Sequence, residues 1–402
     1  MTAGKNSSSL WTPAFVLGSV INFLVMVNYY VPMVAFTDYA MDTYGVNASV
    51  AGLVASIFIV GALCSRIASG VLMALVGARR LLLMGLIAEV VFSCAYLANL
   101  NLPLMLIERF VHGFSYGVST TAVATIVTGI IPDEHKGEGV GYFMLSSTLG
   151  TAIGPFAGMA LLQVSGMMAI FAACIATAVL CLVGFMFFKA GDASSQRRVS
   201  PLRRRGKDEA RGIRALVEPT ALPIAFVAGI VFFAYSCALT FLSPYAQETG
   251  FVFASSVFFM AYAVAAFISR LFTGRLFDRR GALVVMAPSF ILAGAAYILA
   301  GIAVNDAMLI LAGFMLGFGI GTIQSCGLAI AVKKADIARL SFANSTYYAF
   351  TDLGVGVGPI VLGALAPLLG YRDLFGAMSA VIAVGFALYL AIELHSRRVN
   401  GR

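Results

Sequence analysis

Charge is what this sequence of 402 residues has least of. Charged residues make up 11% of the chain and hydrophobic residues 60%, whereas about 25% of the residues of a soluble domain are charged. A soluble protein of this length needs more charge to cover its surface. The composition therefore excludes a water-soluble globular protein and indicates a chain for which lipid is the solvent.

The usual signatures of catalysis are also missing. The sequence has no phosphate-binding GxxxxGK[ST] loop, no nucleophile elbow and no Cys/His set with metal-ligand spacing. All six cysteines lie within apolar segments, where we interpret them as small packing residues. We therefore expect no enzymatic activity, no metal and no cofactor, and any transport must draw on an ion gradient or on the gradient of the solute itself.

What is present is a series of long apolar runs. A helix needs about 20 apolar residues to cross the hydrocarbon of a bilayer, and twelve segments meet this requirement. They are about 13–36, 49–73, 80–98, 104–131, 139–163, 168–188, 220–243, 254–276, 283–304, 306–332, 341–366 and 373–394. The runs are continuous rather than alternating, which argues against a β-barrel. The predicted fold class is an all-α integral membrane protein with twelve transmembrane helices.

The net charge of +8 does not indicate nucleic acid, because the basic residues gather in alternate loops. These loops contain Arg79, Arg80, Lys136, the run 189–214, Arg275, Arg279, Arg280, Lys333, Lys334, Arg339, Arg397, Arg398 and Arg402. Basic loops of this kind face the cytoplasm. With an even number of spans, both termini are then cytoplasmic, and we expect a multi-pass protein of the cytoplasmic membrane.

The chain repeats itself at an offset of 204 residues. Ser65, Arg66, Gly70, Gly113, Gly117, Gly154 and Pro155 are found again as Ser269, Arg270, Gly274, Gly317, Gly321, Gly358 and Pro359. The repeat predicts two pseudosymmetric six-helix bundles, residues 1–189 and 216–402, joined by a basic linker at 190–215 that either binds anionic lipid or is a solvated tether. Duplicated halves in a membrane protein are typical of a transporter whose site lies between them.

Two Gly-Pro pairs occupy matching positions in the repeat, Gly154-Pro155 and Gly358-Pro359. Proline within a helix removes one backbone hydrogen bond and allows bending, and glycine lets neighbouring helices approach closely. The pairs are therefore either hinges that move or places of tight static packing, and we include them among the candidate gating residues.

These features resemble the major facilitator superfamily, and within it the twelve-span drug:proton antiporters. The run 274–281 (GRLFDRRG) matches the superfamily's loop signature, while the first-half copy at 70–80 has Ala74 in place of the acid. Arg109 followed by Gly113 and Gly117 resembles the signature of span 4, and the run 150–158 that of span 5. The resemblance implies alternating access by two rocking bundles, and we expect a monomer.

Within the loop signature, Asp278 lies at the cytoplasmic end of span 8. A carboxylate there is placed to pair with neighbouring arginines and to face the positive N-terminal end of a helix, which the resemblance identifies as span 5, opening near Gly139. We expect Asp278 to latch the halves when the cytoplasmic side is closed; alternatively, these charges fix only topology and loop shape. The expected participants are Gly274, Asp278, Arg279, Arg280 and Gly281.

Ionisable side chains inside the apolar spans cost about 2.5–3.5 kcal/mol each, so each needs a partner or a function. Glu108, Arg109 and His112 lie in span 4, with Glu108 and His112 on one helical face, and Asp352 lies near the middle of span 11. We expect these four residues to carry proton coupling, a role that for Arg109 is implied by the resemblance. The alternatives are a structural Glu–Arg pair in span 4 and, for Asp352, a partnership with a buried arginine or hydroxyl.

Three more ionisable residues are expected to be structural. Glu89 in span 3 is assigned to packing or loop anchoring. Arg66 and Arg270 are placed near the cytoplasmic ends of spans 2 and 8, where they either extend to the interface or bind backbone carbonyls.

Uncharged polar and aromatic side chains mark the helices expected to line a substrate cavity. Hydroxyls, amides and rings with few charges suit a small amphipathic organic solute, and the missing acid in span 1 argues against strongly cationic drugs. The candidates are Asn22, Asn28, Tyr30, Tyr235, Gln324, Asn344 and Tyr348; for each, the alternative is a hydrogen bond between helices.

We therefore expect a secondary transporter that exports a small amphipathic organic compound or drug in exchange for protons. The alternatives are uptake or facilitated diffusion of a small metabolite, and a non-transporting membrane sensor or scaffold, against which the short loops argue. The expected partners are a small-molecule substrate, protons and the lipid bilayer, with no nucleic acid.

Overall fold

The computed structural model describes residues 10–33, 35–46, 48–98, 100–189 and 217–400, and the regular structure of this part of the chain is entirely helical. Its long helices are α1 (Pro13–Met33), α2 (Phe36–Tyr44), α3 (Ala48–Val76), α4 (Ala78–Ala95), α5 (Leu102–Ile130), α6 (Lys136–Phe187), α8 (Leu222–Thr249), α9 (Val252–Arg280), α10 (Ala282–Gly301), α11 (Asp306–Lys334), α12 (Leu340–Leu369) and α13 (Tyr371–Asn400). Short 3₁₀ turns follow α4 (η1, Tyr96–Ala98), precede α6 (η2, Asp133–His135) and precede α12 (η4, Ile337–Arg339). The predicted linker at 190–215 lies outside the described residues.

Helix α6 contains two of the predicted spans. It runs for 52 residues and is broken at Gly166, whose φ of 69° and ψ of −166° are not helical. Ten helices of the described chain are long and apolar enough to cross a membrane, and α5 together with the first arm of α6 meets the same test as a pair bent by 115°. Taken as one span, this pair brings the number in the described chain to eleven, and its two arms lie at the predicted spans 104–131 and 139–163.

The outer surface of the bundles is apolar. Met186, Phe187, Ile360 and Leu368 are each at least 70% exposed. A water-soluble protein does not carry apolar surface on this scale, so the surface agrees with the lipid environment that the composition predicts.

The sequence repeat is also a repeat of helix contacts. A Cβ added to Gly113 on α5 would overlap the backbone carbonyl of Phe58 on α3, and one added to Gly317 on α11 would overlap that of Tyr262 on α9. Both members of the second pair lie 204 residues after those of the first. Glycine is needed at these places because the helix backbones touch.

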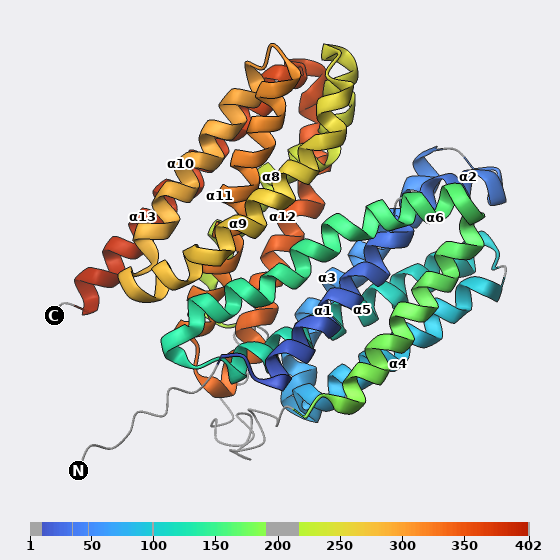
Figure 1. Ribbon diagram of the computed structural model, residues 1–402, viewed down its shortest axis with the longest axis horizontal. Coiled ribbons are helices and arrows are strands. Elements are labelled where there is room, and N and C mark those ends of the chain that lie inside the picture. The colour runs from blue at the N-terminus through green and yellow to red at the C-terminus, as the bar shows by residue number, and fades with distance from the viewer. Residues whose placement is uncertain (1–9, 34, 47, 99, 190–216, 401–402) are drawn as a thin grey trace.

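The halves meet along α6 with α9 and along α3 with α12. Figure 1 shows the two bundles close together where α6 begins and α9 ends, in the lower part of the view, and diverging toward their other ends. The ends that meet carry the arginine- and lysine-containing loops after α3, α5, α9 and α11; we call this side the basic face. The halves are thus joined near the basic face.

Candidate functional site

Two buried arginines lie at the level where the halves meet. Arg66 is ten residues before Val76, the end of α3, and Arg270 is ten residues before Arg280, the end of α9, so each is about 15 Å from its helix end. Their exposed fractions are 3% and 1%. The expectation that they extend to the membrane interface is therefore wrong. Both side chains point into the contact between the halves, where they donate hydrogen bonds to oxygen atoms.

Arg66 on α3 forms an ion pair across the halves with Asp352 on α12. Its Nε lies 3.0 Å from Asp352 Oδ2. Its Nη1 donates to the carbonyl of Gly117 at 3.1 Å and to the hydroxyls of Thr120 and Thr121 at 2.5 and 2.8 Å. Arg66 is buried, whereas the Asp352 side chain is 27% exposed. Asp352 is therefore the partner of a buried arginine and at the same time remains accessible.

Arg270 on α9 also reaches across the halves, but it meets only neutral acceptors. Its Nη1 donates to the carbonyl of Met144 at 2.5 Å and to the hydroxyl of Thr148, both on α6. Its Nη2 donates to Gln324 Oε1 at 3.2 Å and to the carbonyl of Gly321 at 3.5 Å, both on α11. The prediction that this arginine binds backbone carbonyls is confirmed.

Asp278, near the end of α9, binds the beginning of α6 in the other half. Its Oδ1 accepts from the backbone N–H of Gly137 and its Oδ2 from that of Glu138, both at 2.8 Å. These N–H groups belong to the first turn of α6, where no carbonyl of the same helix satisfies them and where the helix dipole favours a negative charge. The structure thus has the contact that the sequence predicts for a latch.

The arginines around Asp278 have other partners or lie in solvent. Arg275 Nε pairs with Glu138 Oε1 at 2.7 Å, also across the halves, while Arg279 and Arg280 are exposed at the end of α9. The expected Asp–Arg pairing within the loop is therefore absent from the described contacts, in which both carboxylate oxygens accept from the first turn of α6.

The glycines of the signature loop have steric roles. A Cβ on Gly274 would lie 2.6 Å from the Cα of Glu138 and 2.7 Å from the carbonyl of Gly137, so α9 and α6 touch there. Gly281 caps α9 at a φ of +87°, and Gly77 ends α3 at the same φ. This left-handed region is readily accessible only to glycine.

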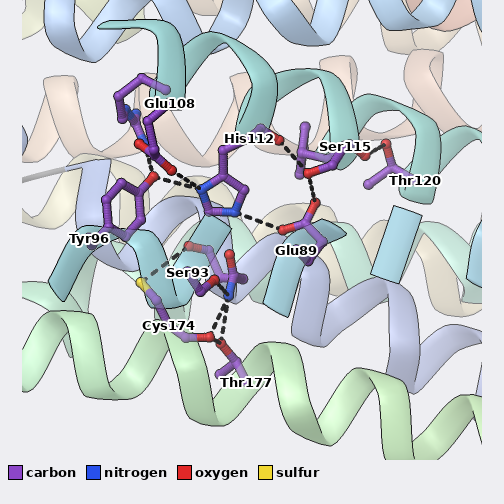
Figure 2. Close-up of polar contacts among 12 residues, drawn as sticks. Glu89, Ser93, Tyr96, Glu108, His112, Ser115, Thr120, Cys174 and Thr177 are labelled. Atoms are coloured by element: carbon purple, nitrogen blue, oxygen red, sulfur yellow. Dashed lines mark hydrogen bonds and ion pairs between the residues drawn. The ribbon is translucent and has the colours of Figure 1, made fainter. Parts of the chain in front are cut away.

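A second cluster of ionisable groups is buried inside the first half (Figure 2). His112 Nε2 lies 2.9 Å from Glu89 Oε2, and His112 Nδ1 lies 2.6 Å from the hydroxyl of Tyr96 and 3.6 Å from Glu108 Oε1. Ser115 donates to Glu89 Oε1 at 3.2 Å. All five side chains are at most 6% exposed. One imidazole is thus enclosed by two acidic side chains inside the first half.

Arg109 lies beside this cluster and is fully buried. Its guanidinium carbon is 4.2 Å from the ring centre of Phe36 and 4.6 Å from that of Phe58. It donates to the carbonyl of Val54 at 3.2 Å and to the hydroxyl of Tyr96 at 3.0 Å. Its positive charge is therefore stabilised by ring faces and by two oxygens.

The structure brings three of the four predicted coupling residues together and separates the fourth. Glu108, Arg109 and His112 share the first-half cluster, whereas Asp352 lies between the halves. Glu89, for which the sequence predicts packing or loop anchoring, is 2% exposed and bonds to His112 and Ser115, so it packs inside the first half, and its membership of this cluster was not predicted. Its signal was the cost of an acid within an apolar span, which requires a partner.

The Gly-Pro pairs lie in tightly packed helix contacts within each half. A Cβ on Gly154 would overlap Tyr30 of α1, and one on Gly358 would overlap Ser236 of α8. Pro359 is inside α12, while the side chain of Pro155 lies outside the described residues. These contacts agree with tight static packing, and a hinge at the Gly-Pro pairs remains a prediction.

Two predicted cavity residues are engaged within the first half. The amide of Asn22 donates to the hydroxyls of Ser146 and Ser147 at 2.8 and 2.9 Å. The amide of Asn28 donates to the carbonyl of Cys174 at 2.6 Å. Both asparagines are 2% exposed, so they bond helix to helix in this conformation.

The remaining cavity candidates lie at or near the contact between the halves. Tyr348 stacks against Arg66 at 4.8 Å from the ring centre, and Gln324 accepts from Arg270. Asn344 donates across the halves to Thr128 Oγ1 at 3.1 Å. Tyr30 packs against Tyr29 with ring centres 4.6 Å apart, and Tyr235 stacks on Tyr262 at 5.2 Å. Among the described residues, no group of three or more metal-binding side chains is present.

Known proteins resemble this chain along most of its length. An uncharacterised transporter of Methanocaldococcus jannaschii is 24% identical over 97% of this chain and 98% of its own. The multidrug resistance efflux pump PmrA of Streptococcus pneumoniae is 23% identical over 70% of this chain and 71% of its own. The crystal structure of the transporter FucP in its outward conformation superposes with a TM-score of 0.75, at 18% identity, over 94% of this chain and 98% of FucP.

The sequence profile of a protein family also matches this chain. The profile of the Major Facilitator Superfamily matches residues 18–338 and 262–401, which together include both halves and all the groups described above. The two joined bundles, the loop signature and the fold of the related structure agree with it. The chain is a membrane transporter that belongs to the Major Facilitator Superfamily.

Proposed function

We propose that this transporter exports a small amphipathic organic compound in exchange for protons, with the basic face toward the cytoplasm. The efflux activity named for its pneumococcal relative supports the direction, and the placement of basic loops supports the orientation. In the described conformation the halves are joined at the basic face, so the substrate path leads to the opposite side. Alternating access requires these contacts to separate in the other half of the cycle.

The observation that carries the proposal is the ion pair of Arg66 and Asp352 across the halves. Protonation of Asp352 removes the negative charge that holds Arg66, and so weakens the contact between α3 and α12. A proton arriving from outside then favours opening toward the basic face. Release of that proton to the cytoplasm restores the charge, and the pair forms again when the transporter carries its substrate outward.

The cluster around His112 is the second proton-binding group in this proposal. Its three titratable side chains, Glu89, Glu108 and His112, lie on α4 and α5 of the first half, and α5 also supplies the threonines that hold Arg66. Helix α5 therefore connects the cluster physically to the ion pair. In this proposal, a proton bound by the cluster acts in the same transport cycle as the proton on Asp352.

Reconstitution into proteoliposomes tests this function. An inward-directed or outward-directed pH gradient is imposed while a panel of cationic, neutral and anionic amphipathic compounds is followed together with internal pH. We expect solute movement opposite to proton movement, and we expect Asp352→Asn to lose the dependence on the gradient. Asp336→Asn is the matched control, because Asp336 is an exposed carboxylate of the loop before α12.

The outcomes separate the candidate functions. Solute flux that ignores the pH gradient in the wild type removes proton coupling and leaves facilitated diffusion. Solute and protons moving in the same direction indicate uptake. Full coupling in Asp352→Asn removes Asp352 as the proton carrier.

A further inference from the structure

The repeat places Arg66 and Arg270 in matching surroundings that differ in one group. Both arginines donate to a glycine carbonyl of the helix packed beside them, and both reach across to the other half. Across the halves Arg66 meets the carboxylate of Asp352, whereas Arg270 meets the hydroxyl of Thr148, the residue that the repeat aligns with Asp352. Among the described ion pairs, none involves Arg270. The first guanidinium is neutralised and the second is not.

The two arginines differ most clearly at the Nε atom of the guanidinium. Nε of Arg66 holds Asp352 Oδ2 at 3.0 Å, whereas Nε of Arg270 is buried without an acceptor. Nε and Nη2 form an edge with which arginine binds a carboxylate through two parallel hydrogen bonds. The acceptors at Nη2 of Arg270 are neutral and long, at 3.2 Å to Gln324 and 3.5 Å to Gly321. This edge is therefore suited to receive an anion.

The cost of burying this charge gives the anion a thermodynamic reason to bind. A buried guanidinium without a counter-charge loses hydration that carbonyl and hydroxyl dipoles restore only in part. A carboxylate on the Nε–Nη2 edge of Arg270 replaces the weak Gln324 bond with a charged pair. Gln324 is itself half-buried, so the group to be displaced lies toward the accessible side.

An aromatic pair lies two turns from the arginine along α9. Tyr262 is two turns before Arg270 on α9, away from the basic face, and its ring stacks on Tyr235 of α8 at 5.2 Å. Both tyrosines are half-buried. Ring faces beside a cation suit a solute that has an apolar part and one acidic group.

We infer that Arg270 binds the carboxylate of the transported solute, and that this solute is an organic monocarboxylate whose apolar part packs toward Tyr235 and Tyr262. The solute then supplies to Arg270 the counter-charge that Asp352 supplies to Arg66. The inference rests on the proposed transport function for the path of the solute, but it concerns binding and needs no pH gradient.

The test uses full-length protein in nanodiscs near neutral pH, where carboxylates are ionised. Its midpoint of thermal unfolding is measured with benzoate, phenylacetate and hexanoate, and with the corresponding amides. Thr148→Asp gives Arg270 an internal carboxylate at the position of the repeat, and Thr148→Asn is the uncharged control of the same shape. We expect the acids, but not the amides, to stabilise the wild type and Thr148→Asn.

In Thr148→Asp we expect a higher unfolding midpoint without ligand and an apparent affinity for the acids at least about tenfold weaker than in Thr148→Asn. Arg270→Lys keeps the positive charge but lacks the Nε–Nη2 edge that forms two parallel hydrogen bonds. It should therefore also bind the acids more weakly than the wild type. Equal responses to acids and amides, no response to any acid of the set, or equal affinity in the two Thr148 variants overturns the inference. Acid binding that is lost in Thr148→Asp, combined with gradient-independent flux in proteoliposomes, keeps the carboxylate site and removes proton-coupled export.

Discussion

At the scale of single residues, His112 has the most demanding surroundings. It is 1% exposed and lies between the carboxylates of Glu89 and Glu108. Removing one partner of a buried hydrogen bond costs about 1–3 kcal/mol, because the other polar group is left without a partner and away from water. We expect His112→Gln to lower the midpoint of thermal unfolding in detergent and to reduce gradient-driven transport in proteoliposomes.

A second variant separates the structural and the coupling contributions of this residue. In Glu89→Gln/His112→Gln the two amides can hydrogen-bond to each other and no acid is left at position 89 without a partner, so most of the lost stability should return. Gradient-driven transport should remain impaired, because glutamine does not exchange protons. Wild-type coupling in the double variant would show that the cluster only packs the first half.

Sequence alone identifies the residues that are costly to bury but rarely identifies their partners. Arg66 and Asp352 are 286 positions apart, and Glu89 meets His112 only because α4 packs on α5 with one particular rotation. Local patterns carry no information about that rotation. Asp278 was predictable because the superfamily signature fixes both its position and the helix end that it faces.

At the scale of helices, the contact of α9 with α6 depends on Gly274. An added Cβ there would lie 2.6 Å from the Cα of Glu138 and 2.7 Å from the carbonyl of Gly137, which is too close for any real contact. We therefore expect Gly274→Ala to push the helices apart and to weaken the bonds from the first turn of α6 to Asp278. Hydrogen exchange of the Gly137 and Glu138 amides should be faster than in the wild type.

The matched control for this prediction lies on the same contact. A Cβ on Gly141 would have the carbonyl of Arg270 as its nearest neighbour, at an ordinary 3.8 Å. Gly141→Ala should leave the exchange of the α6 amides unchanged. Identical exchange in Gly274→Ala and Gly141→Ala would mean that the helices accommodate the methyl group and that Gly274 does not control the contact.

The helices themselves were largely predictable, because long apolar runs have few alternatives in lipid. The run predicted at 306–332, for example, is α11 at Asp306–Lys334. Helix α2 was missed because it has only nine residues and is weakly apolar. The two arms of α6 were also predicted, because the non-helical backbone at Gly166 lies between the predicted spans at 139–163 and 168–188.

At the scale of the whole molecule, the described conformation is one end of the transport cycle that we propose. The contacts that join the halves at the basic face combine a charge at a helix end, an ion pair and a glycine contact, all between α6 and α9. The halves diverge toward the other side in Figure 1. If the halves move as rigid bundles, holding one contact at the basic face should be enough to stop the cycle.

We expect a short bis-methanethiosulfonate cross-link in Glu138→Cys/Arg275→Cys to abolish transport, in a background without the six native cysteines. These side chains meet across the halves at 2.7 Å, so the cross-link holds the basic face closed. The control is His135→Cys/Glu138→Cys, a pair at 3.3 Å within one half, which should transport when cross-linked. Reduction should restore transport in the first variant. Undiminished transport by its cross-linked form would contradict alternating access through this contact.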